Sequence, residues 1–258
     1  MSEWRPNYSM PAGSGDAWAD DYERGRPGYP AEAVAVAGVS AGATVLDLGA
    51  GTGKLTRQLV GTFARVIAVE PAAAMRRVLV QRCPEAEAAE GTAERIPLAD
   101  GAVDAVFAAE AFHHFDAPRA VGEIARVLRP RGTLVLLWNL PAGPTEPPID
   151  DIERLAANRG LTRERLGYDP VDLNSPKYTD GRWRDAFSGT PFEPLRDDRF
   201  PHIQTLERDE LVAFIASMGW VGDLPDEERL PLLDEVRALL DADEYRRPWE
   251  THVCWTRR

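Results

Sequence analysis

The stretch from Val45 to Lys54, VLDLGAGTGK, constrains the fold of this chain more than any other. Apolar residues around Asp47 are followed by three glycines at alternate positions, and then by a segment with apolar side chains at helical spacing. This order predicts a buried strand, a tight turn and a helix. A helix that begins after such a turn offers backbone N–H groups and a positive dipole end to a ligand. The sequence therefore predicts a nucleotide-sized pocket at the carboxyl end of a parallel strand.

Strand-like and helix-like segments alternate through the first half of the chain. Strands are expected at 43–48, 66–69, 87–90, 103–108 and 133–138, and helices at 31–38, 54–63, 72–82 and 119–128. This alternation predicts an α/β fold with a doubly wound, mostly parallel sheet. The pattern changes after residue 140, where a proline-rich linker at 141–148 leads to helices expected at 149–158, 206–218 and 227–240 and to strands expected at 192–200 and 251–257.

Composition excludes several classes of function. The chain of 258 residues has a formal net charge of −12, which disfavours nucleic acid as a partner because phosphate backbones would be repelled. No apolar run is long enough to cross a bilayer, so no membrane association is expected. The two cysteines form no C-x-x-C pair and the four histidines show no zinc spacing, so we expect a cytoplasmic protein without a metal site.

The spacing of the glycines indicates which kind of nucleotide the predicted pocket would bind. A dinucleotide fingerprint reads G-x-G-x-x-G, but here the third glycine comes one residue early and Asp47 precedes the first by two. A carboxylate at that place suits a ligand with cationic groups better than a pyrophosphate. Glu70 ends the second strand about 20 residues further on and is placed to accept the ribose hydroxyls of an adenosine. Dehydrogenases use such a residue too, so an NAD(P)-binding oxidoreductase stays open as an alternative.

The segments 47–54, 92–94 and 98–104, taken together with Glu70, resemble the successive contact segments of the class I S-adenosylmethionine (SAM)-dependent methyltransferases. Within that class, the segments at 22–30, 111–115, 138–139 and 182–187 resemble the branch of trans-aconitate methyltransferase-like and related small-molecule enzymes. The resemblance implies a Rossmann-like, seven-stranded sheet with an N-terminal helical arm and a helical cap inserted after the fifth strand. We expect one domain: an arm at 1–30, a SAM-binding core at 31–140, a cap with the sixth strand at 141–250 and the last strand at 251–258.

The resemblance also implies a cofactor site for SAM, whose product is S-adenosylhomocysteine (SAH). The turn from Gly49 to Gly53 would surround the methionyl part of SAM, and Glu70 would bind the ribose. Thr92 and Ala93 would contact the adenine edge. The family usually has an aspartate in place of Thr92. The expected cofactor-binding residues are Arg26, Asp47, Gly49, Ala50, Gly51, Thr52, Gly53, Glu70, Pro71, Met75, Thr92, Ala93, Glu94, Glu110 and Ala111. Arg26 is the candidate partner of the cofactor carboxylate, because its guanidinium can bind a carboxylate through two N–H groups.

Two groups of residues are candidates for the chemistry on the acceptor. His113 and His114 are the only histidines near the inferred methyl position, and either is a candidate general base or a residue that holds the loop. Trp18, Tyr22, Trp183 and Trp220 would form an apolar acceptor pocket, or else belong to the core. The arm with Trp18 and Tyr22 would either close over the pocket or pack on the core.

The expected function is transfer of a methyl group from SAM to an O, N or C atom of a small organic molecule by in-line displacement. Alternatives are a methyltransferase for a protein or RNA, the NAD(P)-binding oxidoreductase, and a catalytically silent partner protein with this fold. The expected partner is a small-molecule acceptor, and the chain is expected to be a monomer or a homodimer. Neither the acceptor nor the methylated atom follows from the sequence.

Overall fold

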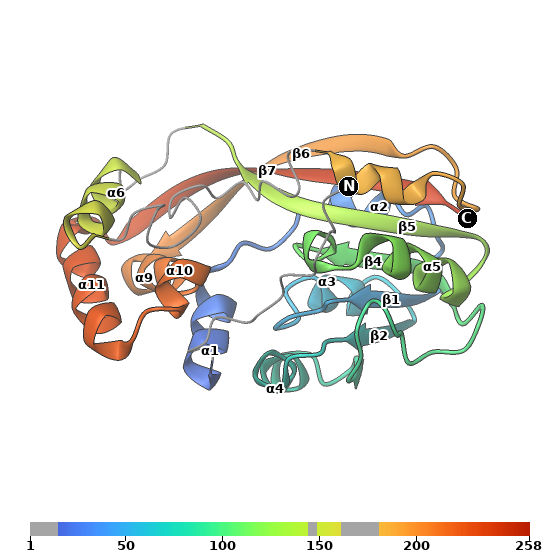
Figure 1. Ribbon diagram of the computed structural model, residues 1–258, viewed down its shortest axis with the longest axis horizontal. Coiled ribbons are helices and arrows are strands. Elements are labelled where there is room, and N and C mark those ends of the chain that lie inside the picture. Colours follow the sequence, from blue (N-terminus) through green and yellow to red (C-terminus); the bar gives the residue numbers. More distant parts are fainter. Residues whose placement is uncertain (1–14, 144–148, 161–180) are drawn as a thin grey trace.

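The computed structural model describes residues 15–143, 149–160 and 181–258. Parts of the expected arm, of the proline-rich linker and of the segment before residue 182 therefore lie outside the described residues. The strands are β1 (Thr44–Leu48), β2 (Arg65–Val69), β3 (Glu87–Ala89), β4 (Val103–Ala109), β5 (Leu128–Pro141), β6 (Arg196–Glu207) and β7 (Glu244–Arg257). They form one seven-stranded sheet in the order β3-β2-β1-β4-β5-β7-β6 (Figure 1).

The sheet is parallel from β3 to β5, and β7 runs antiparallel to both of its neighbours, β5 and β6. This arrangement confirms the predicted Rossmann-like, mostly parallel sheet. Because the strand order reverses direction beside β1, the carboxyl ends of β1 and β4 border a crevice, which is where open α/β sheets bind their ligands.

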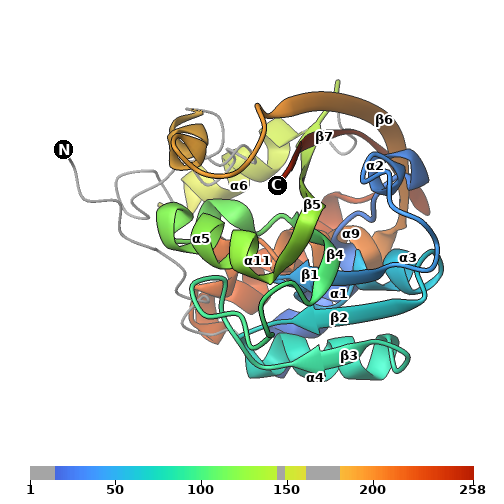
Figure 2. The ribbon, with the colours of Figure 1, turned by 90° about the vertical axis from the view of Figure 1, so that its right-hand side faces the viewer.

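Helices cover both faces of the sheet. They are α2 (Ala31–Ala35), α3 (Thr56–Val60), α4 (Ala73–Arg82) and α5 (Ala117–Val127), with short 3₁₀ helices η1 (Phe112–His114) and η2 (Arg182–Phe187). In Figure 2, α5 lies on one side of the sheet and α2 and α3 lie on the other. Successive residues of β1 supply the two cores: Val45 packs on the side of Leu59, and Leu46 on the side of Ile124. A strand buried on both faces explains its continuous apolar character.

A second group of helices lies beyond the sheet. It contains α1 (Asp16–Gly25), α6 (Ile149–Asn158), α9 (Arg208–Ala216), α10 (Gly219–Gly222) and α11 (Asp226–Leu239), and Figure 1 shows it beside the core. α1 crosses α9 so closely that a Cβ on Gly25 would lie 2.1 Å from the backbone nitrogen of Phe214. The arm therefore packs on the helices of the predicted cap as well as on α4. No helix in the described part of the chain has the length and apolar character that a membrane span needs.

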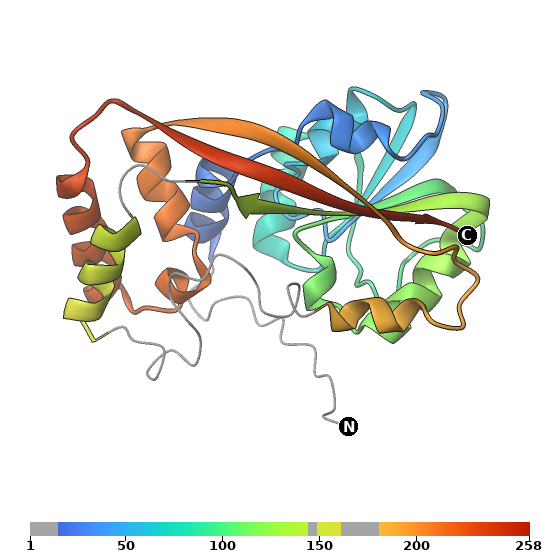
Figure 3. The same ribbon diagram turned by 90° about the horizontal axis from the view of Figure 1, so that it is seen from above.

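β6 and β7 are far longer than expected. The predicted strands at 192–200 and 251–257 cover only parts of them. β6 pairs with β7 over its whole length, from Arg196 with Trp255 to Glu207 with Glu244, and the two run as one ribbon from the core to the second group of helices (Figure 3). Charged residues and prolines interrupt the alternation of apolar and polar residues in these strands, so the sequence did not predict their full length. β6 is an edge strand, where exposed charges and a proline such as Pro201 are tolerated.

Candidate active site

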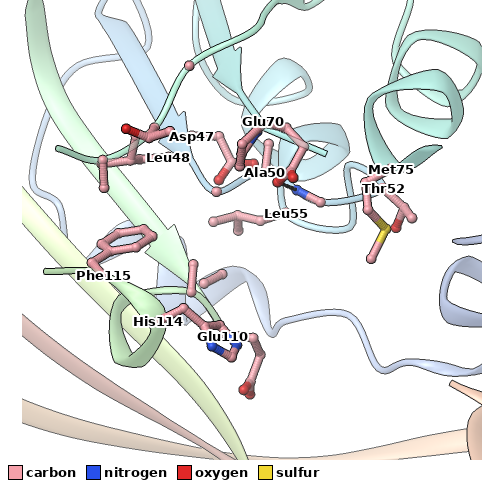
Figure 4. A pocket seen from close by; sticks show the side chains of 18 of the residues that line it. Asp47, Leu48, Ala50, Thr52, Leu55, Glu70, Met75, Glu110, His114 and Phe115 are labelled. Atoms are coloured by element: carbon pink, nitrogen blue, oxygen red, sulfur yellow. Dashed lines mark hydrogen bonds between the residues drawn. The ribbon is translucent and has the colours of Figure 1, made fainter. Parts of the chain in front are cut away.

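A cavity of about 660 Å³ lies at the carboxyl ends of β1, β2 and β4, and α1 forms one of its walls. Figure 4 shows part of its lining. The residues that line it are Trp18, Tyr22, Tyr29, Asp47, Leu48, Gly49, Ala50, Gly51, Thr52, Lys54, Leu55, Glu70, Pro71, Met75, Gly91, Thr92, Ala93, Glu94, Arg95, Ala109, Glu110, Ala111, His114, Phe115, Asp116 and Arg119. Its volume is in the range of about 300–1,000 Å³ that is usual for pockets of small ligands.

The glycine turn between β1 and α3 forms the floor of this cavity. The backbone N–H groups of Gly49 and Ala50 both donate to the carbonyl oxygen of Val69, at 2.8 and 3.1 Å, which ties the turn to β2. Gly51 has φ +57°, and a Cβ there would meet no atom within 4 Å. At Gly49 (φ +73°) a Cβ would lie 2.7 Å from that of Ala111. The turn therefore needs glycine for its conformation, and of these two glycines only Gly51 leaves open space beside its backbone.

Glu70, at the end of β2, holds the glycine turn in place. Its carboxylate accepts hydrogen bonds from the backbone N–H of Gly51 at 2.9 Å and of Ala72 at 2.8 Å. Burial raises the pKa of Glu70, and the two backbone donors act in the opposite direction. A carboxylate has about four acceptor positions, so two stay available for hydroxyl groups of a ligand.

Asp47 is fully buried at the end of β1, where its Oδ2 accepts a hydrogen bond of 2.6 Å from the hydroxyl of Thr56. Burial raises the pKa of Asp47 to about 7, the charge of Glu70 raises it further, and the bond from Thr56 lowers it. The carboxyl therefore titrates near neutral pH in the ligand-free protein. A positively charged ligand would restore its ionised form.

Glu110 lies across the cavity from Glu70, at the end of β4 (Figure 4). It has a positive φ of +50°, which is uncommon for a residue with a side chain and is typical of functional sites. Its Oε1 accepts a hydrogen bond of 2.5 Å from the backbone N–H of Asn139. Burial raises the pKa of Glu110 to about 7, while this bond and the charge of Arg26 lower it.

Two polar atoms at the cavity are buried and have no hydrogen-bond partner within the ranges that the structure describes. They are the hydroxyl of Thr52, in the glycine turn, and the indole N–H of Trp18, on α1. Buried polar groups are normally paired, so each of the two is available to a bound molecule. Together with the open space at Gly51, they indicate that the residues present fit a polar ligand.

The structure brings most of the predicted site residues to this cavity, but not all of them. Arg26 donates to the hydroxyl and the carbonyl of Ser217, at 2.8 and 3.0 Å, and is not among the lining residues. Gly53 faces α4, where a Cβ would lie 2.8 Å from both Cys83 and Leu79.

The two adjacent histidines differ in position. His114 lines the cavity, whereas His113 does not. The Nδ1 of His113 accepts a hydrogen bond of 3.2 Å from the indole of Trp138. Two of the predicted acceptor aromatics also lie elsewhere. Trp183 packs against Phe112 and Trp138 in the core, and Trp220 lies in the core of the second group of helices.

Several lining residues are not among the individually predicted site residues, although Leu48 and Lys54 lie within the predicted contact segment 47–54. Charged ones are Lys54, Arg95, Asp116 and Arg119, and apolar or aromatic ones include Tyr29, Leu48, Leu55 and Phe115. Lys54 and Leu55 directly follow the glycine turn, so their position in the sequence could have predicted that they line the cavity. Asp116 and Arg119 come from the start of α5, whose N-terminus Asp116 caps. The order Asp-x-Pro at 116–118 is a helix-start signal that the expected boundary at 119 missed. Glu94 stabilises the start of α5, because its Oε1 accepts a hydrogen bond of 2.8 Å from the backbone N–H of Asp116.

The fold is that of a Rossmann-like α/β protein with a cavity at the carboxyl ends of its strands, and comparisons with known proteins identify the family. A family described as "Methyltransferase domain" matches residues 46–136. An uncharacterized methyltransferase of Mycobacterium tuberculosis, Rv3342, is 40% identical over 220 residues, which cover 85% of this chain and 82% of that protein. A methyltransferase-like protein of Schizosaccharomyces pombe, C25B8.10, is 33% identical over 86% of this chain and 82% of its own length. The chain belongs to the class I SAM-dependent methyltransferases.

Solved structures share the fold. A candidate type II methyltransferase from Anaeromyxobacter dehalogenans superposes with a TM-score of 0.62, at 23% identity, over 90% of this chain and 97% of that one. The YcgJ protein of Bacillus subtilis superposes with a TM-score of 0.52, at 22% identity, over 87% and 95% of the two chains. The family membership sets aside both the oxidoreductase and the catalytically silent partner protein.

The raised pKa values of Asp47 and Glu110 predict that a cationic ligand such as SAM, which carries a sulfonium and an ammonium, binds in this cavity with a pH-dependent affinity. The ionised fraction of a carboxyl with a pKa of about 7 rises from about one tenth at pH 6 to about nine tenths at pH 8. SAM affinity is therefore expected to rise over this range by about tenfold for each of the two carboxyls that must be ionised to bind the cation, with release of protons near pH 7. Calorimetric titration in buffers of different ionisation enthalpy measures the affinity and the number of protons released. An affinity for SAM that does not change with pH would contradict the prediction.

The same carboxyls affect the stability of the ligand-free protein. Their folded-state pKa values lie above those of the unfolded chain, so their contribution to stability is fully present below about pH 4. That contribution is lost as the pH rises through about 7. The stabilisation that SAM adds should consequently grow over the range in which the ligand-free protein loses it.

Proposed function

We propose that this chain binds SAM in the cavity at the glycine turn and transfers its methyl group to an O, N or C atom of a small organic molecule. The observation that carries the proposal is the polar half of the cavity, where Glu70, Asp47 and the open backbone at Gly51 meet. The acidic net charge of −12 supports a small acceptor over RNA. The wall that α1 builds over the cavity supports a small acceptor over a protein surface.

The residues that would hold SAM follow from their places around the cavity. The turn from Gly49 to Thr52 and the carboxylate of Asp47 would surround the methionyl part, and the two free acceptor positions of Glu70 would take the ribose hydroxyls. Pro71 and Met75 would lie against the adenosine, with Thr92, Ala93 and Glu94 at its edge. Glu110 and Ala111 would line the opposite side.

SAM, when bound, supplies a methyl group that is already activated on a sulfonium. The protein therefore has to align the acceptor and exclude water, and such positioning can contribute up to about 7–11 kcal/mol. Trp18 and Tyr22, whose ring centroids lie 5.5 Å apart on α1, cover this side of the cavity and would exclude water from it. Trp183 and Trp220, which lie in the core, have no place in this arrangement.

If the acceptor must lose a proton, His114 is the proposed base, because it lines the cavity while His113 is held by Trp138. A positioned base contributes about 10²–10⁴-fold to the rate. We therefore expect His114→Ala to lower kcat by about that factor without changing SAH affinity, and His113→Ala to have a smaller effect. Equal, full activity of both variants in a methyl-transfer assay would exclude the base.

The class of acceptor can be tested with SAM labelled in its methyl group. The protein is incubated with a cell extract that has been separated into a low-molecular-weight filtrate and a macromolecular fraction. Label is expected in products formed from the filtrate, and not in protein or RNA. Incorporation into the macromolecular fraction alone would favour the alternative of a protein or RNA methyltransferase. A Glu70→Ala variant serves as the control for transfer that depends on this cavity.

A further inference from the structure

Lys54 is the cation that directly follows the glycine turn, and its side chain lines the cavity. The residue is half-buried, and burial lowers the pKa of its ammonium group, so a counter-charge would stabilise the charged form. Within the ranges that the structure describes, this ammonium has neither a hydrogen bond nor an ion pair. It is therefore available to an anionic group of a molecule that occupies the cavity.

The two carboxylates whose charges act on Lys54 bind other groups. The charges of Glu23, on α1, and of Glu210, on α9, raise the pKa of Lys54. Glu23, however, pairs through its Oε1 with Arg57 at 2.8 Å. Glu210 accepts a hydrogen bond of 2.9 Å from the backbone N–H of Glu207, as part of the cap of α9. Both carboxylates attract the charge of Lys54, but neither forms an ion pair with it.

The other cations that line the described part of the cavity come from other segments. Arg95 follows the predicted adenine-contacting segment 92–94, and Arg119 lies in the first turn of α5. Arg26, the candidate from sequence for the cofactor carboxylate, donates to Ser217 and is not among the lining residues. Lys54 is thus the lining cation beside the turn, where the amino-acid end of the cofactor would lie.

We propose that Lys54 binds the carboxylate of the cofactor and thereby restricts the site to adenosyl donors that carry a complete amino-acid end. This inference rests on the proposed function and deepens it, because it assigns to Lys54 the ion pair that the sequence suggested for Arg26. The ammonium group of the cofactor would lie on the side of Asp47, so each charge of the amino-acid end would have a partner of opposite sign. A donor without the carboxylate would leave Lys54 half-buried and unpaired.

The test compares three ligands that differ in the amino-acid end. SAH carries both charges, decarboxylated SAH lacks only the carboxylate, and methylthioadenosine lacks the whole amino-acid part. Calorimetric titration of the full chain should show that the wild type prefers SAH over decarboxylated SAH at least about tenfold. Lys54→Met should lose this preference, because its SAH affinity falls at least about tenfold while its affinity for methylthioadenosine changes less than about twofold. Lys54→Arg, which keeps the charge, should retain a preference for SAH.

Arg82→Met is the matched control. Arg82, at the end of α4, is exposed and does not line the cavity, but its charge acts on Lys54 as well. The variant therefore loses the same charge close to the cavity, and its preference for SAH should equal that of the wild type. Circular dichroism shows whether each variant is folded, and Lys54→Gln repeats the measurement without the charge if Lys54→Met does not fold.

The opposite results are equally specific. The proposal is overturned if Lys54→Met keeps the full preference, if Arg82→Met loses as much of it, or if the wild type binds decarboxylated SAH as tightly as SAH. An equal loss of affinity for methylthioadenosine in Lys54→Met would mean that the lysine only supports the conformation of the turn, and would overturn it too. If the wild type binds none of the three ligands, the proposed function itself fails, which is a separate result.

Discussion

Gly51→Ala is expected to weaken SAH binding by about 10- to 100-fold while the protein stays folded. A Cβ at Gly51 would meet no protein atom within 4 Å, so the methyl group would occupy cavity space that the ligand needs. Forcing an extra methyl group into a filled site costs about 1–3 kcal/mol, which corresponds to the stated loss of affinity. Calorimetric titration with SAH measures the effect directly.

Gly101→Ala is the matched control. Gly101 also has a left-handed backbone, with φ +61°, and a Cβ added there would likewise meet no atom within 4 Å, but it lies outside the cavity. Both variants should lose about the same stability, on the order of 1 kcal/mol, from the strained φ of alanine. Only Gly51→Ala should lose SAH affinity. Equal affinities in the two variants would show that no ligand approaches Gly51.

Glu70→Ala is expected to weaken SAH binding by about 100-fold or more. It removes two acceptor positions for hydroxyl groups, and each hydrogen bond to a charged group contributes about 1.5–3 kcal/mol. It also leaves the backbone N–H groups of Gly51 and Ala72 without their acceptor, so the unfolding temperature should fall.

Glu90→Ala provides the comparison for Glu70→Ala. Glu90 is an exposed carboxylate just after β3 that pairs with Arg76 at 2.8 Å, and its loss should change neither stability nor SAH affinity appreciably. Circular dichroism shows whether each variant is folded. A folded Glu70→Ala protein with unchanged SAH affinity would remove Glu70 from the proposed site.

The parts of the site that could be predicted from sequence are those formed by consecutive residues. A buried strand, three glycines and a helix start determine their own geometry, so the turn at 49–53 was predicted. Glu70 was predicted only as an acceptor for the ribose hydroxyls, and its hydrogen bond to Gly51 was not. Parallel strands bring their carboxyl ends to one edge, which explains why Glu110 was expected and found on the same cavity.

The parts that could not be predicted depend on packing between distant segments. Arg26 is directed to Ser217 by the close crossing of α1 and α9, and nothing near Arg26 in the sequence encodes that contact. Trp183 was a candidate for the acceptor pocket or for the core, and its ring packs in the core with Phe112 and Trp138. Aromatic residues carry no local signal that separates these two environments.

The central claim is that the cavity between the glycine turn and Glu110 binds the adenosyl cofactor. A crystal structure of the protein with SAH tests it most directly. The account predicts SAH in this cavity, with its ribose hydroxyls on the carboxylate of Glu70 and its amino-acid part along the backbone from Gly49 to Thr52. SAH bound at another place, or an empty cavity in crystals saturated with SAH, would contradict it.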